Sequence, residues 1–173
     1  MKRKELIGLI IVILVIAMII LSFILYNELP LLTGERIVLA TMPVDPFDPF
    51  MGQYMDIRYE ISNLNDVKGF EEGDNVYVKL EKDGGGIWRS NGVSKIKPTV
   101  GDFIKGDVIN VYENRINVEY GIERFYFERN AKVSIINITV EIKVANSGRA
   151  KLVQLLQNGK PAEIKYKDFD IKE

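Results

Sequence analysis

Two hydrophobic patterns divide the chain. Residues 6–26 form an apolar run without a charge, broken only by Gly8, Ser22 and one alanine. As a helix rising about 1.5 Å per residue, this run would reach about 31 Å and cross the hydrocarbon core of a bilayer. Further on, apolar and polar residues alternate in short segments separated by turn-forming residues, the pattern typical of strands. The sequence therefore predicts a single N-terminal transmembrane helix followed by a mostly β domain.

The alternating segments define the expected strands. They lie at residues 35–42, 54–61, 76–81, 87–97, 107–112, 115–120, 136–144 and 149–156. Asp83-Gly-Gly-Gly86 is expected to be a hairpin turn, Asn91-Gly92 a bulge, and residues 128–133 a short helical turn. About eight short strands predict an antiparallel sandwich or a partly open barrel.

The segment from Pro43 to Ser62 is the centre of this interpretation. Its two Asp-Pro pairs, at 45–46 and 48–49, predict a rigid crossing outside the sheet, and Gly52 begins a predicted central strand. The strand's core face would carry Met55, Ile57, Tyr59 and Ile61. Its other face would carry Tyr54, Asp56, Arg58 and Glu60. The alternating charges allow a ladder of weak ion pairs on a solvated face, or a recognition surface anchored by Tyr54 and Arg58.

Charges flanking the apolar run predict its orientation. Lys2, Arg3 and Lys4 precede the run and Glu28 follows it, so the N-terminus should be cytoplasmic and the domain outside the cell membrane. A cleaved signal peptide is the alternative, but the run is longer than such a core and lacks small cleavage residues. We expect a head at 1–5, an anchor at 6–26, a linker at 27–34, the domain at 35–160 and a charged tail at 161–173.

Composition narrows the chemistry further. The chain has no cysteine and no histidine, which excludes disulfides, thiolate or imidazole metal sites, and catalysis by Ser–His or Cys–His pairs. Of its 23 basic and 24 acidic residues, three basic and one acidic residue lie in the head, so the domain is mildly acidic. A basic stripe for nucleic acid is missing, and we expect neither nucleic acid nor a cofactor as a ligand. The expected partners are the lipid bilayer, through residues 6–26, and another protein.

Several strings give the chain a family resemblance. Gly52-Gln-Tyr-Met-Asp-Ile-Arg-Tyr59 resembles the Gly-Asp-Tyr-x-x-Leu-x-Tyr string of the GDYXXLXY family of prokaryotic membrane-anchored proteins. The resemblance continues through Thr33-Gly-Glu-Arg36, Gly73-Asp-Asn-Val-Tyr-Val78, Trp88-Arg89 and Val118-Glu-Tyr-Gly-Ile-Glu-Arg-Phe125. Gln53 replaces the family's Asp, which weakens a catalytic reading of that position, and Ile57 replaces Leu. The family has no established activity, and its members often accompany a multi-spanning membrane protein, which the resemblance implies as a partner here.

Three functions fit the sequence. The first is a non-enzymatic binding or accessory module, and its candidate contact residues are Asp45, Asp48, Tyr54, Asp56, Arg58, Tyr59, Glu123 and Arg124. The second is a signal-peptidase-like hydrolase, in which Lys95 or Lys97 would activate Ser90 or Ser94, provided that the lysine is buried. The third is a calcium or sugar site built from the acidic residues of the 45–60 segment. We favour the first and assign no catalytic or metal-binding residue.

Overall fold

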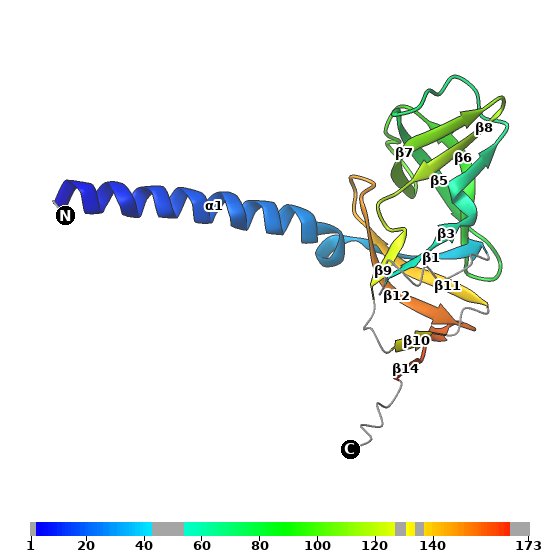
Figure 1. The fold of residues 1–173 in the computed structure, drawn as a ribbon. Helices are drawn as coiled ribbons and strands as arrows, with labels where there is room; N and C mark the ends of the chain where they lie inside the picture. Colours follow the sequence, from blue (N-terminus) through cyan, green and yellow to red (C-terminus); the bar gives the residue numbers. More distant parts are fainter. Residues whose placement is uncertain (1–2, 43–53, 127–130, 134–136, 167–173) are drawn as a thin grey trace, which may run out of the picture.

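The computed structural model describes residues 3–42, 54–126, 131–133 and 137–166, which form one long helix and a β domain (Figure 1). The helix is α1 (Arg3–Thr33), and the short 3₁₀ helix η1 spans Glu60–Ser62. The strands are β1 (Glu35–Met42), β2 (Tyr54–Asp56), β3 (Arg58–Tyr59), β4 (Asn63–Asn65), β5 (Asn75–Lys82), β6 (Trp88–Ser94), β7 (Phe103–Tyr112), β8 (Arg115–Glu119), β9 (Arg124–Tyr126), β10 (Ala131–Val133), β11 (Ile138–Val144), β12 (Ala150–Gln157), β13 (Lys160–Pro161) and β14 (Ile164–Tyr166).

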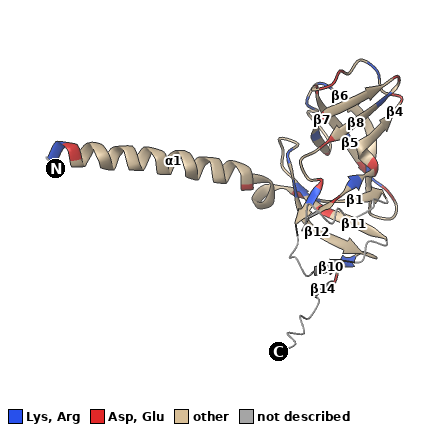
Figure 2. Ribbon diagram, viewed as in Figure 1, with Lys and Arg blue, Asp and Glu red and all other residues tan. Residues whose placement is uncertain are grey.

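The apolar run forms the greater part of α1. This helix has 31 residues and is long and apolar enough to cross a membrane, which is compatible with a single-pass anchor. It projects away from the β domain, and its charged residues lie only near its two ends (Figure 2). The helix continues to Thr33 and so includes nearly all of the segment 27–34 that was expected to be a linker. The helical structure persists there because this part of α1 contacts β11 and β12.

Ten of the strands form one large mixed sheet. The order is β13-β12-β11-β1-β6-β5-β7-β8-β4, and β3 pairs beside this path with β1. The prediction of a mostly β domain behind one apolar helix is confirmed. The pairs are antiparallel except for β1 with β6, which meet in parallel at Leu39 and Trp88. The sheet is not closed into a barrel; its β5–β8 part lies on the side of the domain away from α1 (Figure 1).

The segment after Gly52 is not the single central strand that its alternation predicts. It divides into β2, β3, η1 and β4, because successive parts pair with different neighbours: β2 with β9, β3 with β1, and β4 with β8. The predicted core face is nevertheless correct, since Met55, Ile57, Tyr59 and Ile61 are all buried. Period-two alternation thus determined which side chains are inside without determining the strand partners.

One prediction near the C-terminus is wrong within the described residues, and part of the predicted tail forms a strand. Residues 131–133 of the predicted helical turn form strand β10, and the other residues of that turn lie outside the described chain. The predicted tail contains β14, which pairs with β10. The short strands β10 and β14 form by pairing with each other across about thirty residues, so the local sequence of neither segment predicts a strand. The hairpin across Glu113-Asn114 and the bulge at Asn91-Gly92, opposite the register shift of β5, are confirmed.

A continuous apolar core joins the two halves of the sheet. It receives the inward-facing residues of β1, β5, β7, β8 and β11, whose alternation is regular. Trp88, which the sequence left open as a core or an exposed residue, is partly buried against this core. The largest fully buried side chain belongs to Tyr59, in the segment that resembles the family string.

Candidate functional site

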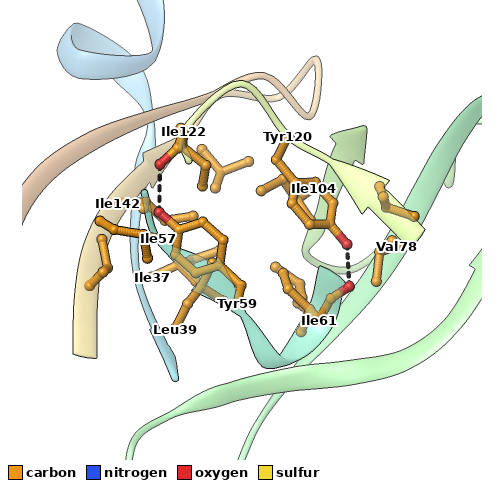
Figure 3. Close-up of a cluster of buried hydrophobic side chains, with 14 of the residues drawn as sticks. Ile37, Leu39, Ile57, Tyr59, Ile61, Val78, Ile104, Tyr120, Ile122 and Ile142 are labelled. Atoms are coloured by element: carbon orange, nitrogen blue, oxygen red, sulfur yellow. Dashed lines mark hydrogen bonds between the residues drawn. The ribbon is translucent and has the colours of Figure 1, made fainter. Parts of the chain in front are cut away.

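Two tyrosines fix the central segment to the turn that precedes β9. The Tyr59 hydroxyl donates a hydrogen bond to the Ile122 carbonyl at 2.7 Å, and the Tyr120 hydroxyl donates one to the Ile61 carbonyl at 2.5 Å. Both phenol rings lie in the core, and the two bonds run in opposite directions between the same two segments (Figure 3). We call this arrangement the tyrosine latch. It supplies buried carbonyl groups with the donors that they require.

Glu123 lies at the exposed side of the tyrosine latch. Its Oε1 accepts a hydrogen bond from the backbone N–H of Tyr120 at 2.6 Å, and its carbonyl accepts one from the N–H of Ile57 at 2.6 Å. Burial raises the pKa of Tyr59 and of Tyr120 far above the ordinary value, and the charge of Glu123 adds to the effect. This predicted contact residue is half-buried, and its observed contacts hold the latch segments together.

The exposed residues near the latch form a small two-stranded surface. β2 and β9 pair with Asp56 opposite Arg124, and the Arg124 Nε lies 3.8 Å from the Asp56 Oδ1. Both side chains are more than half exposed, and Tyr126 is 69% exposed on the same ribbon. We call Asp56, Arg124 and Tyr126 the ribbon face. Exposed ion pairs of this kind contribute about 0–1 kcal/mol to stability.

The structure brings together only some of the predicted contact residues. Asp45 and Asp48 lie outside the described residues, and Tyr54 is described only through its backbone pairing with Tyr126. Arg58 is exposed on β3. Tyr59 is fully buried, so its side chain is part of the core and is not available for contact.

The expected Asp56–Arg58–Glu60 ladder is replaced by ion pairs with arginines from elsewhere in the chain. Asp56 pairs with Arg124, and Glu60 pairs with Arg89 of β6. The sequence does alternate in charge at Asp56, Arg58 and Glu60, but the strand ends at Tyr59 and these three side chains do not form a row on one strand. The side chains therefore find partners on β9 and β6.

A cleft that the sequence did not reveal lies beside this segment. It has a volume of about 500 Å³ and is lined by η1, β4, the residues just after β4, and β6. Arg89 crosses it by pairing with Glu60, and its Nε also donates to Asp83 at 2.9 Å. Asp83 holds the β5–β6 turn by accepting from Gly85 and Ile87. The Asp83-Gly-Gly-Gly86 string predicted the turn between β5 and β6, but it did not predict the cleft or the ion pairs of Arg89.

The ion pair between Arg89 and Asp83 favours the charged form of both side chains. The backbone N–H of Ile87 and then the guanidinium of Arg89 lower the pKa of Asp83. The hydrogen bond from Arg89 to Asp83, followed by the charge of Glu60, raises the pKa of Arg89. Arg89, in the wall of the cleft, is therefore held between the carboxylates of Glu60 and Asp83.

A second group of polar contacts joins α1 to the β domain. Pro30 lacks an N–H, which leaves the carbonyl of Tyr26 without its helical donor. Arg149 supplies the donor, with its Nη1 at 3.2 Å from that carbonyl and its guanidinium 4.2 Å from the centre of the Tyr26 ring. Lys151 pairs with Glu28 at 3.1 Å, and the Nζ of Lys143 donates to the Leu31 carbonyl at 2.6 Å. We call these contacts the juxtamembrane clamp.

The clamp is completed by a close backbone approach at Gly34. Its N–H donates to the Pro30 carbonyl at 2.9 Å. A Cβ at this position would overlap that carbonyl oxygen and lie 3.0 Å from the backbone of Val144. Cations at the C-terminal end of α1 also complement the negative end of the helix dipole. The end of the helix and the domain are consequently joined by several contacts just before Gly34 and by the close approach at Gly34 itself.

Comparison with known proteins identifies the family of this chain. The model of the GDYXXLXY protein family matches residues 16–155, which is most of the chain. The chain belongs to the GDYXXLXY family. Neither the curated proteins nor the solved structures gave a match.

The family string can now be placed on the fold of this GDYXXLXY protein. Its Leu and last Tyr positions are occupied by Ile57 and Tyr59, and both are buried in the core. Its Asp position is occupied by Gln53, which lies outside the described residues. Ile57 and Tyr59 of the string therefore belong to the core, and Tyr59 also forms the latch.

The residues proposed for a Ser–Lys dyad do not have the required environment. Lys95 and Lys97 are exposed. Lys95 pairs with Asp74 at 2.6 Å and lies over the Phe70 ring. The Ser94 hydroxyl accepts a hydrogen bond from Ile96 and thus holds the following turn. A lysine general base needs burial, and both lysines are exposed.

Metal binding finds little support in the described parts of the chain. There, three or more acidic side chains do not converge into a group that could hold an ion. Glu141, the one buried carboxylate among the described residues, lies 3.5 Å from Arg36 and accepts a hydrogen bond from Gln154 at 3.1 Å. A carboxylate paired in this way serves as an ion-pair partner within the sheet.

Proposed function

We propose that this GDYXXLXY protein is a non-catalytic accessory subunit of a membrane complex. In this proposal α1 crosses the cell membrane once with its basic N-terminus in the cytoplasm, and the β domain binds a multi-spanning membrane protein at the outer surface. The positively charged head supports this orientation. The partner class follows from the family resemblance, and the geometry of the chain supports a binding role.

The observation that carries the proposal is the juxtamembrane clamp. A domain that only needed a tether would be served by a flexible linker. Here the helix continues to Thr33, and Arg149, Lys151 and Lys143 bond it to the domain. Such a junction fixes the height and the orientation of the domain relative to the bilayer. A fixed orientation is useful for a domain that must meet a partner in the same membrane.

The ribbon face is the surface that we propose for the partner. Its ion pair is exposed and contributes little stability, whereas Tyr126 combines an exposed ring with a hydroxyl. Tyrosine and arginine are enriched among the residues that contribute most of the binding energy at interfaces. Arg58 of β3 is exposed and follows the ribbon strand β2 closely in sequence, so we include it in the proposed surface.

Membrane orientation is tested by cysteine labelling, since the chain has no cysteine of its own. Lys68→Cys places a thiol at an exposed position of the domain, and Lys4→Cys places one before the anchor. A membrane-impermeant maleimide should label Lys68→Cys in intact cells and Lys4→Cys only after lysis. The reverse pattern would put the domain in the cytoplasm and end this part of the proposal.

The subunit role is tested by photocrosslinking in the native membrane. A photoreactive amino acid at Tyr126 or Arg58 should give one discrete adduct with a multi-spanning protein. The same group at Tyr112, which is also exposed, is the control and should not give it. A flexible insertion between Thr33 and Gly34 should abolish the adduct, whereas the same insertion in the turn at Gly84 should preserve it. Adducts that survive the first insertion would show that the clamp is irrelevant to binding.

A further inference from the structure

The cleft lies between two strand edges that run in the same direction. In the array β6-β5-β7-β8-β4 every neighbouring pair is antiparallel. With five strands, the first and the last must point the same way. These are β6 and β4, and residues of both line the cleft. One additional strand, antiparallel to both, would continue the alternation across the gap.

Backbone groups of β6 point into this gap. The N–H of Leu80 donates to the Asp102 carbonyl, so Leu80 directs its backbone groups toward β7. Ser90 lies opposite Leu80 and therefore directs its N–H and C=O away from β5. Val78, two residues before Leu80, likewise directs its backbone groups toward β7, so its partner Val93 directs its N–H and C=O away from β5. The pairing of β6 with β1 is confined to Trp88, so it does not reach these groups.

Backbone groups of β4 point toward the same gap. Val108 bonds with the residues just before β5, so its partner Val118 directs its backbone groups toward β4. Two residues earlier, Ile116 does the same and meets Leu64. The next residue, Asn65, therefore directs its N–H and C=O away from β8. Among the described residues, the backbone pairings give these groups of Ser90, Val93 and Asn65 no partner.

We propose that the cleft binds an extended peptide segment as an added strand between β4 and β6. Exposed strand edges are templates for further strands, and strand addition is a common mode of peptide recognition. The cleft's volume is in the range of sites that bind compact ligands. This inference rests on the proposed function and deepens it, because it names the kind of segment that the binding module takes.

Side chains in the cleft define the chemistry of that segment. The apolar lining consists of Ile61, Leu64, Val67 and Val93. The charged lining consists of Glu60, Asp66 and Arg89, and Arg89 is already held by Glu60 and Asp83. Successive side chains of a strand point to opposite faces. The segment should therefore alternate apolar residues, which face the core, with basic residues that can meet Asp66 at the rim.

Full-length protein in detergent is screened with a displayed library of random linear peptides of about ten residues. Enriched peptides should alternate apolar residues with Lys or Arg. Methylating alternate backbone nitrogens of the best peptide keeps its side chains but removes strand hydrogen bonds, and should weaken binding by at least about tenfold. Ser90→Pro removes an N–H that faces the cleft, a position that tolerates proline because the ladder with β5 does not use it. It should weaken binding similarly, while Ser90→Ala should bind as the parent does.

Each result decides the matter. If no peptide is enriched, or the methylated peptide binds equally well, the cleft is not a strand-addition site. Protection of the Ser90 amide from hydrogen exchange in the free protein would also overturn the inference, since the edge would already be paired. If Ser90→Pro fails to fold, the methylated peptide still gives the answer with the parent chain. Peptide binding without a crosslinked membrane partner would refute the subunit proposal alone, and the converse would refute this inference alone.

Discussion

The tyrosine latch predicts a specific loss of stability when one hydroxyl is removed. In Tyr59→Phe the ring remains in the core, but the Ile122 carbonyl loses its donor at 2.7 Å. Tyr59 is completely buried, so water does not reach the site to replace the hydroxyl. Leaving a buried acceptor unsatisfied costs about 1–3 kcal/mol. We expect the free energy of unfolding at neutral pH to fall by this amount.

The latch also predicts a response to alkaline pH. The pKa of Tyr59 is raised in the folded state, mainly by burial, whereas an unfolded tyrosine ionises near pH 10. The neutral phenol therefore stabilises the fold fully below about pH 10, and this contribution is lost as the pH rises toward the folded pKa. Above about pH 10 each latch tyrosine should reduce stability by up to about 1.4 kcal/mol per pH unit. Tyr59→Phe removes one such contribution and should make the decline shallower.

The assay is urea unfolding of the full chain in detergent, followed through the fluorescence of Trp88, the single tryptophan, which is partly buried. Stability is measured at pH 7 and at steps between about pH 9 and pH 12. Tyr112→Phe is the matched control, because that side chain is 54% exposed. If Tyr59→Phe were as stable as the parent at pH 7, or declined as steeply in alkali, the latch would not be a source of stability.

Three further results are expected. Gly34→Ala should lower the unfolding temperature, because the added Cβ would overlap the Pro30 carbonyl at a cost of about 1–3 kcal/mol. Gly84→Ala is the control, since its Cβ would meet no atom within 4 Å. Equal unfolding temperatures for the two variants would refute the close approach at Gly34. Arg149→Ala should broaden the spin-label distance distribution between α1 and the domain, and an unchanged width would mean that the clamp does not restrain the helix. Glu35→Gln should flatten the dependence of melting temperature on pH between about pH 4 and pH 8. A hydrogen bond with Asp102 and repulsion from its charge raise the pKa of Glu35 in the folded state. The stabilisation that Glu35 gives at acid pH is therefore lost as the pH rises. If Glu35→Gln left the dependence of melting temperature on pH unchanged, this interaction with Asp102 would be excluded.

Local patterns predicted the elements better than their partners. The apolar run predicted the helix, and the bounds of β1 were predicted to the residue. Alternation placed Met55, Ile57 and Tyr59 inside. It did not show that this segment divides among three neighbours, because pairing depends on residues far away in the chain. β2 meets β9, and β4 meets β8, through contacts that leave no mark on local periodicity.

The candidate sites show the same limit more strongly. The sequence suggested that Asp56 and Arg124 belong to one surface, and the structure brings them together. The sequence did not predict the cleft, because the cleft forms where β4 and β6, the two end strands of a five-strand array, line the same gap. The sequence did not predict the clamp either, since Arg149 meets Tyr26 across 123 positions. Periodicity reports which side chains are buried, whereas sites arise where distant segments meet.

The position of the latch connects the family string to both proposed binding surfaces. Tyr59 and Tyr120 hold the segment from Ile57 to Ile61, which follows the ribbon strand β2 and leads into the cleft wall at η1. Removing the latch should therefore disturb both surfaces together, whereas changes at Tyr126 or Ser90 should affect one surface each. The described positions that give the family its name consequently specify the framework of the domain. Differences in binding between members are then expected in the exposed residues of the ribbon face and the cleft.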